Sequence, residues 1–293
     1  MEIQPQTIYS GIIDQLNTLS PDRRHNPFVL NRFRQEAEKL KNVNLAFAFS
    51  ALGVISTLER NIQDVRKNFD LSLSHARERY TSIYLNYAVS LGKLGYLSEA
   101  EKVLQTAYNI FRYDLKILES LMEYSILSGK LRQAYNLIED WIKLSPNTMC
   151  EIGQIIIPAA QEFNKLQYPD DLFENYFAAI TKIFRDENLF IASERIISND
   201  GSKPTLYNQY YIDAPGIEIN RITETIDSAI KEFPTDLKEF FYFDLPYPES
   251  DIENLIVSVE KDIEIPSEKL VDADESQLRR LANLVGLDVD QWL

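Results

Sequence analysis

Glycine is scarce in this sequence, at 9 of 293 residues. Because glycine supplies the positive backbone φ angles that many tight turns need, this composition argues against a turn-dense β protein. Hydrophobic residues make up 45% of the chain, which is enough for a sizeable core and excludes a mainly disordered protein. We therefore expect a folded protein built mainly from long helices.

Cysteine and histidine are scarcer still. Cys150 is the single cysteine, so no internal disulfide can form, and a reducing compartment is favoured. Neither His25 nor His75 has a neighbouring ligand at metal-binding spacing. The sequence also contains no glycine-rich phosphate loop, no Gly-x-Ser-x-Gly elbow and no His-Glu-x-x-His motif. It therefore predicts no catalytic residue, no metal or other cofactor, and a protein that is not an enzyme.

Long apolar runs are absent as well. The longest, residues 155–160, is far shorter than the roughly 20 residues that span a bilayer. After Met1 the sequence shows neither the basic region nor the apolar region of a secretory signal. We expect a soluble, cytoplasmic protein that has no membrane partner.

Basic residues are few, since 30 Lys and Arg face 45 Asp and Glu, for a net charge of −15. The stretch from Asp200 to Leu293 holds 21 acidic and 8 basic residues and thus carries −13 of that charge. Such a chain repels the phosphates of nucleic acids and anionic lipids, so direct binding to nucleic acid is not expected. The charge favours a basic protein partner, although an acidic surface also serves solubility alone.

The clearest feature that is present is an internal period of 34 residues. The pairs that match at this spacing are Gly95 and Gly129, Leu97 and Leu131, Ala100 and Ala134, Leu104 and Ile138, and Ala107 and Trp141. Tyr84, Tyr87, Ala88 and Leu91 lie at i, i+3, i+4 and i+7 and predict a helix that ends at Gly95. The small and apolar stripe after the glycine predicts a second helix, so each unit is expected to be a helical hairpin.

This pattern resembles the tetratricopeptide repeat, a 34-residue helical hairpin that stacks into a right-handed solenoid. Units start near Ala46, Thr81 and Leu115, so that the resemblance covers about residues 46–148. The residues that carry it are Phe49, Leu52, Gly53, Val65, Phe69, Tyr84, Tyr87, Ala88, Leu91, Gly95, Ala100, Leu104, Ala107, Leu118, Leu121, Gly129, Ala134, Ile138 and Pro146. The chain departs from the family at Met122 and Trp141, where small residues are usual.

Apolar stripes on both sides extend the helical prediction. Residues 5–19 and 28–41 resemble a hairpin without the repeat signature, which predicts an N-terminal cap over residues 1–43. A degenerate fourth unit is predicted from Ile156, Ala159, Ala160 and Phe163, followed by Leu172, Tyr176 and Ala179. Pro158 would kink or delay its first helix. The repeats then occupy residues 44–186.

Beyond residue 187 the pattern becomes richer in β-forming residues. The predicted segments are strands at 189–197 and 205–212, a helix at 217–233 and a strand at 240–245. Asp200 and Gly201 between the first two runs are typical of a hairpin turn. We therefore expect a mainly α protein with a small ββαβ appendage at residues 187–262. An acidic linker and an amphipathic helix follow at residues 263–293.

The resemblance also implies a binding surface, because the first helices of tetratricopeptide repeats line a partner-binding groove. In this chain the corresponding residues are Phe47, Ser50, Val54, Asn86, Val89, Lys93, Lys116, Ser120 and Glu123. One subclass of the family binds a terminal carboxylate through a basic and amide clamp, and here only Asn86 and Lys116 match it. We therefore expect a mixed, partly apolar groove suited to an extended peptide or an amphipathic helix.

The function favoured by these patterns is that of a non-catalytic scaffold or adaptor. Its acidic C-terminal region would add a second contact with the partner, for which Tyr210, Tyr211 and Trp292 are candidate anchors. The alternative is an acidic inhibitor or regulator, of the antitoxin or DNA-mimic kind, that masks a basic surface. An enzyme with its site in the α+β part is least favoured. The sequence leaves open whether copies of the chain associate with each other.

Overall fold

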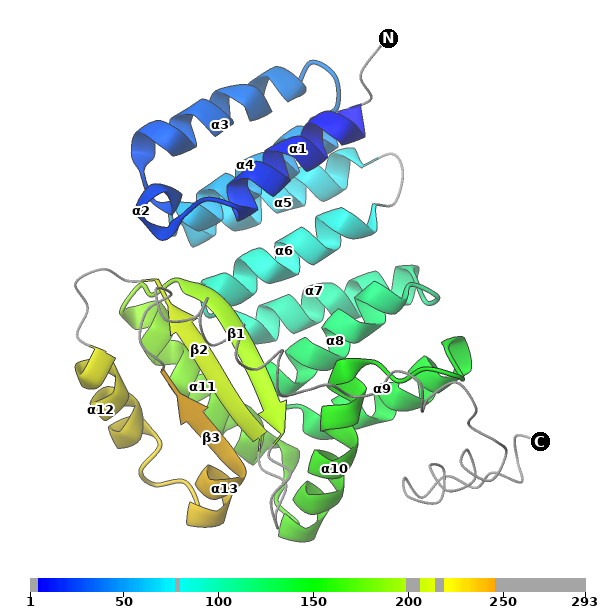
Figure 1. Cartoon of the computed structure of the whole chain (residues 1–293), viewed down its shortest axis with the longest axis vertical. Helices are drawn as coiled ribbons and strands as arrows, with labels where there is room; N and C mark the ends of the chain where they lie inside the picture. Colours follow the sequence, from blue (N-terminus) through cyan, green and yellow to red (C-terminus); the bar gives the residue numbers. More distant parts are fainter. Residues whose placement is uncertain (1–4, 77–79, 199–205, 214–218, 246–293) are drawn as a thin grey trace, which may run out of the picture.

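The computed structural model describes residues 5–76, 80–198, 206–213 and 219–245, most of which are helical. The helices are α1 (Pro5–Asn17), α2 (Pro21–Arg24), α3 (Pro27–Leu40), α4 (Leu45–Leu58), α5 (Ile62–His75), α6 (Thr81–Lys93), α7 (Leu97–Ile110), α8 (Leu115–Leu127), α9 (Leu131–Leu144), α10 (Glu151–Leu166), α11 (Asp170–Asp186), α12 (Ile219–Ala229) and α13 (Thr235–Phe240). The strands are β1 (Ile191–Ser198), β2 (Leu206–Ile212) and β3 (Phe241–Asp244). The helices form a stack of packed pairs, and the strands form a small sheet beside its C-terminal end (Figure 1).

Consecutive helices pack as pairs along the stack. α4 packs on α5, α6 on α7 and α8 on α9, and each pair also contacts the next. α6 begins at Thr81 and α8 at Leu115, where the 34-residue period places the starts of two units. The N-terminal helices α1 and α3 form a further pair against α4, as Figure 1 shows. The mainly helical prediction is therefore confirmed.

The turn inside each of the first three repeat-like hairpins passes through a residue in the left-handed conformation. Gly95 (φ 78°) and Gly129 (φ 83°) hold this position in two turns, and Arg60 (φ 58°) holds it in the turn between α4 and α5. In each turn the backbone N–H of the next residue donates to the carbonyl oxygen five residues earlier. The distance is 3.0 Å for Asn61, 2.9 Å for Tyr96 and 2.7 Å for Lys130. This bond satisfies a carbonyl group at the C-terminal end of the first helix. Arginine adopts the left-handed conformation less readily than glycine does, because its Cβ atom is crowded there.

Helix α10 continues the stack by packing against α8 and α9. Ile156, Ala159 and Phe163 are buried, as their predicted stripe requires. Pro158 lies inside the helix, which runs unbroken from Glu151 to Leu166, so it does not delay the helix start. Proline removes only one backbone donor, and the burial of the apolar stripe offsets that loss.

Helix α11 takes a different path from the earlier second helices. A Cβ added to Gly129 would lie 2.7 Å from the backbone carbonyl of Phe173, and Arg185 Nη1 donates to the Gly95 carbonyl over 2.7 Å. α11 therefore crosses the turns of two earlier hairpins. Its buried residues are Phe173, Tyr176, Phe177, Ile180, Thr181, Ile183 and Phe184. The predicted stripe is corrected accordingly, since Leu172 and Ala179 are only partly buried.

The sheet lies on α11, as Figure 1 shows. The strand order is β1-β2-β3, with β2 antiparallel to β1 and parallel to β3. The rings of Tyr210 and Phe184 lie 5.3 Å apart, and those of Phe241 and Phe177 lie 5.0 Å apart. Three strands and α12 fall where the ββαβ pattern predicts them. The short helix α13 precedes β3 and was not predicted.

Two predicted features lie outside the described residues. These are the Asp200-Gly201 turn and the linker and helix at residues 263–293, including Trp292. Among the described helices, none combines the length and the apolar character needed to cross a membrane.

Candidate functional site

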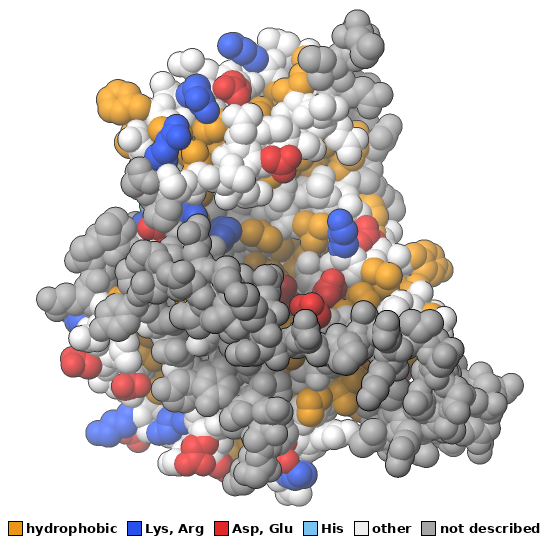
Figure 2. Space-filling view, in the orientation of Figure 1, with side chains coloured by type: hydrophobic (Ala, Val, Ile, Leu, Met, Phe, Trp, Pro, Cys, Tyr) orange, Lys and Arg blue, Asp and Glu red, His pale blue; other side chains and the backbone are white. Residues whose placement is uncertain are grey.

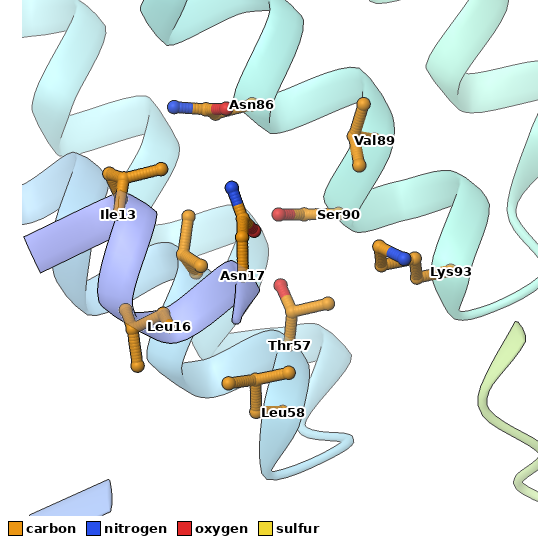
Figure 3. A pocket seen from close by; sticks show the side chains of 10 residues that line it. Ile13, Leu16, Asn17, Thr57, Leu58, Asn86, Val89, Ser90 and Lys93 are labelled. Carbon is orange, nitrogen blue, oxygen red and sulfur yellow. The ribbon is translucent and has the colours of Figure 1, made fainter. Parts of the chain in front are cut away.

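Three neighbouring helices of the stack, α1, α4 and α6, line a small pocket that opens to solvent (Figure 3). Its lining residues are Ile13, Leu16 and Asn17 from α1, Val54, Thr57 and Leu58 from α4, and Asn86, Val89, Ser90 and Lys93 from α6. On each helix these positions follow the spacing i, i+3 and i+4, with i+7 added on α6, so each helix presents a single face to the pocket. The pocket therefore follows from the way in which the three helices are stacked.

The floor of the pocket is mostly apolar, formed by the buried residues Ile13, Leu16 and Leu58, and it also contains the hydroxyl groups of Thr57 and Ser90. The exposed edge is mixed, since Val89 is apolar and 41% exposed and Asn17 is polar and exposed. Figure 3 shows the polar ends of Asn17 and Ser90 directed towards the centre of the pocket. In the space-filling view, hydrophobic side chains also reach the surface near the middle of the stack, bordered by Lys, Arg, Asp and Glu side chains (Figure 2). The site can thus combine apolar contact with hydrogen bonding.

A buried hydrogen-bond network holds Asn86 in place at the pocket edge. Asn86 Nδ2 donates to the Tyr9 hydroxyl over 2.6 Å, and that hydroxyl lies 2.7 Å from Ser50 Oγ. The Tyr9 ring stacks on Phe47 with centroids 4.7 Å apart. Burial raises the pKa of Tyr9, which the bonds to Ser50 and Asn86 only partly oppose, so the phenol stays neutral. Because the amide nitrogen of Asn86 is bound to Tyr9, its side-chain carbonyl oxygen points away from Tyr9.

Lys93 connects the pocket with the α+β appendage. Its Nζ donates to the Ala192 carbonyl of β1 over 2.7 Å and lies 5.4 Å from the centroid of the Phe190 ring. Because Lys93 also lines the pocket, the start of β1 borders this end of the site. The appendage therefore contacts a residue that lines the pocket.

A cluster of charged residues lies beyond this border and is called the junction cluster: Arg24, His25, Arg60 and Asp213. Asp213 Oδ2 lies 3.0 Å from Arg24 Nη1 and 3.3 Å from His25 Nε2. Arg60 donates to the backbone carbonyls of Asp213, over 2.6 Å, and of Asn188, over 3.1 Å. Burial opposes ionisation of the Asp213 carboxyl, yet the bonds and charges of His25 and Arg24 hold its pKa below the usual value.

The structure separates the predicted groove residues into three groups. Val54, Asn86, Val89 and Lys93 meet in the pocket. Phe47 and Ser50, at 2% and 0% exposed, are covered by α1. Lys116, Ser120 and Glu123 lie on α8 and do not line the pocket.

The predicted secondary contacts are not displayed on a surface. Tyr210 is 1% exposed and Tyr211 is 6% exposed, because both pack within the appendage. Trp292 lies outside the described residues.

Several pocket residues were not predicted from the sequence. Those from α1 were missed because the N-terminal hairpin lacks the repeat signature and was interpreted only as a cap. The one available signal was the amphipathic stripe of Ile12, Ile13 and Leu16, which ends beside Asn17. Thr57, Leu58 and Ser90 were missed because the family pattern does not mark their positions.

Among the described residues, the side chains that could bind a metal or act as a nucleophile do not form a second candidate site. Within the described ranges, no group of three or more His, Cys, Asp or Glu side chains could hold a metal ion. Cys150 is buried, and burial raises the pKa of its thiol to about 11. The thiol is therefore protonated at neutral pH and is a weak nucleophile.

The fold and the pocket define a mainly helical protein of stacked helix pairs with a small α+β appendage. Comparisons with protein-family models, curated proteins and solved structures find no match for this chain. The resemblance of residues 46–148 to the tetratricopeptide repeat stays a prediction.

Proposed function

We propose that this protein is a non-catalytic scaffold that binds a segment of a partner protein in the pocket between α1, α4 and α6. The observation that supports this proposal is the convergence of Val54, Asn86, Val89 and Lys93 on one pocket. The family resemblance predicts these four residues as groove residues. The pocket joins an apolar floor to amide and hydroxyl groups, a combination typical of binding sites.

The chemistry of the pocket favours an extended peptide over a helix. Asn17 and Asn86 carry carboxamides, which offer both a donor and an acceptor to a peptide group. An extended segment has unpaired N–H and C=O groups to meet them, whereas a helix satisfies these groups internally. An aliphatic side chain of the peptide would enter the apolar floor formed by Leu16 and Leu58. The charge of Lys93 favours an acidic residue at the adjacent position of the peptide.

The proposal can be tested by selecting peptides from a phage-displayed random library and measuring their affinity. Val89→Glu places a charge at the apolar edge, and we expect it to raise the Kd of selected peptides about tenfold or more. Asn17→Ala removes one carboxamide and should raise the Kd about threefold to tenfold. Because both residues are exposed, neither change is expected to unfold the protein.

Matched controls are available outside the pocket. Val43 is 57% exposed in the loop before α4, and Asn109 is exposed on α7. Val43→Glu and Asn109→Ala should leave the Kd unchanged. The proposal is overturned if no aliphatic consensus is enriched, or if selected peptides bind Val89→Glu as tightly as Val43→Glu.

A further inference from the structure

Two hydroxyl groups lie in the buried part of the pocket, where α4 packs against α6. Thr57 on α4 and Ser90 on α6 are 2% and 3% exposed, so both residues are almost fully buried. Figure 3 shows both hydroxyls directed into the same space, beside the carboxamide of Asn17. A buried polar group without a hydrogen-bond partner costs free energy, so such groups are normally bonded within the protein. The partners of these two hydroxyls therefore indicate whether the pocket is complete without a ligand.

The Ser90 hydroxyl is not satisfied by the protein. Within the part of the chain that the structure describes, Ser90 Oγ has no hydrogen-bond partner. Other buried serines differ, since Ser56 and Ser125 each donate to the carbonyl four residues earlier, over 2.9 and 2.7 Å. Ser72 donates to the Ala46 carbonyl over 2.6 Å. Because Ser90 also lines an open pocket, its hydroxyl is available to a ligand as both donor and acceptor.

The polar groups on either side of Ser90 act as acceptors. Thr57 Oγ1 donates its hydrogen to the Gly53 carbonyl over 3.0 Å, so only the lone pairs of this oxygen are left for the pocket. Asn86 donates through Nδ2 to the Tyr9 hydroxyl, which leaves its side-chain carbonyl oxygen as an acceptor. The pocket therefore offers a donor from Ser90 next to acceptors from Thr57 and Asn86.

This arrangement discriminates between the chemical groups of a peptide. A carboxylate only accepts, so it has no hydrogen to donate to Thr57 or Asn86. An ammonium group only donates, and among the described residues no Asp or Glu lines the pocket to balance its charge. An aliphatic group would cover the Ser90 hydroxyl and leave it without a partner. A hydroxyl group donates and accepts through one oxygen, so it can bond to Ser90 and Thr57 together.

We propose that Ser90 and Thr57 form a subsite for the hydroxyl group of a serine or threonine in the bound peptide, called the hydroxyl subsite. The hydroxyl of the peptide accepts from Ser90 Oγ and donates to Thr57 Oγ1. A neighbouring aliphatic residue of the peptide occupies the floor at Leu16 and Leu58. The hydroxyl subsite rests on the proposed function, because it names a side chain of the peptide that the pocket binds.

Peptides selected from the phage-displayed library test the hydroxyl subsite. We expect serine or threonine to be enriched at one fixed position relative to the aliphatic residue. Synthetic peptides with threonine or valine at this position have side chains of similar shape, since valine replaces the hydroxyl by a methyl group. The threonine peptide should bind the natural chain about tenfold more tightly than the valine peptide does. In Ser90→Ala this preference should fall to about threefold or less, because the donor of the subsite is lost.

Ser72→Ala is the matched control. Ser72 is also a buried serine, but it lies on α5, outside the pocket, so this variant should keep the tenfold preference. The two variants can also be compared without peptide. Ser72→Ala loses the bond to Ala46, whereas Ser90→Ala loses no hydrogen bond. The Tm of Ser72→Ala should therefore lie about 2 °C or more below that of Ser90→Ala.

The possible failures of the two proposals differ. Equal affinities for the threonine and valine peptides, or a preference that Ser90→Ala leaves unchanged, would overturn the hydroxyl subsite while the aliphatic consensus still supports the proposed function. Enrichment of a charged or carboxamide side chain at this position would overturn the subsite in the same way. A Tm of Ser90→Ala as low as that of Ser72→Ala would show that the Ser90 hydroxyl is already bonded within the protein, which contradicts the subsite without any peptide. If the library yields no aliphatic consensus, the proposed function fails, and the subsite fails with it.

Discussion

Two of the contacts between the sheet and the helical stack have opposite character. On the α11 side, Phe241 and Tyr210 are each 1% exposed and pack against aromatic rings. At the other end, the junction cluster and Lys93 hold the sheet through charged groups that are partly exposed. Apolar contact is non-directional and depends little on pH, whereas charged hydrogen bonds depend on ionisation and geometry. The comparison indicates that the aromatic contact stabilises the position of the sheet independently of pH, whereas the contribution of the junction depends on the charge of its residues.

The largest effect is expected at the aromatic contact. The Phe241 ring has centroids of Phe173 and Phe177 at 5.0 Å and of Phe240 at 4.8 Å. Phe241→Ala leaves a cavity among these rings and should lower the free energy of unfolding by about 3–4 kcal/mol. Urea denaturation followed by circular dichroism measures the change. Phe28, which is 89% exposed, provides the matched control, and Phe28→Ala should cost less than about 0.5 kcal/mol. Equal effects of the two variants would contradict the aromatic anchor.

A smaller effect is expected at Arg60, where the backbone and the side chain act in opposite directions. The left-handed φ of 58° disfavours any residue but glycine, while the guanidinium holds the Asp213 and Asn188 carbonyls. Arg60→Ala loses the bonds and keeps the strain, so we expect a loss of about 2 kcal/mol in unfolding free energy. Arg60→Gly loses the same bonds but relieves the strain, and it should be about 1 kcal/mol more stable than Arg60→Ala.

The Arg60 comparison has its own control in the turn between α6 and α7. Gly95 has the same left-handed conformation, with φ of 78°, and an added Cβ would lie 3.2 Å from Phe184 Cβ. Gly95→Ala should therefore destabilise the protein by about 1 kcal/mol. If Arg60→Ala and Arg60→Gly are equally stable while Gly95→Ala is destabilised, the backbone at Arg60 carries no strain.

Much of the helical stack can be predicted from the sequence because its packing repeats. The 34-residue period places a left-handed turn at Gly95 and Gly129 and starts α6 and α8 at the observed residues. The family resemblance adds the prediction that Asn86 and Val89 on α6 are groove residues, and both line the pocket. In these cases local spacing alone determines which side chains share a face.

The junction and the α1 side of the pocket could not be predicted in this way. No local spacing relates Arg60 to Asp213, which lie 153 residues apart, and no repeat signature marks the helix that carries Asn17. The position of α1 depends on the bonds between Tyr9, Ser50 and Asn86, which form only after the helices have stacked. Aromatic periodicity similarly failed to reveal the path of α11, because its buried face is determined by the sheet and the turns that it crosses.

The smallest effect is expected from the charge of Asp213, and it sharpens the contrast with the aromatic contact. A carboxyl whose folded-state pKa lies below its unfolded value stabilises the fold at pH above that unfolded value, and this contribution is lost as pH falls through the folded pKa. The Asp213 side chain is 8% exposed, but its partners Arg24 and His25 are 13% and 22% exposed, so solvent screening reduces the contribution to about 0.5–1 kcal/mol. Asp213→Asn keeps an acceptor for Arg24 but removes the charge. We expect the natural chain to exceed this variant in unfolding free energy at pH 6, and the difference to shrink as the pH is lowered towards 3. A difference that is unchanged at pH 3 would show that Asp213 acts through its shape and hydrogen bonds alone. Phe241→Ala should instead give a deficit of the same size at both pH values, because no charge takes part in the aromatic contact.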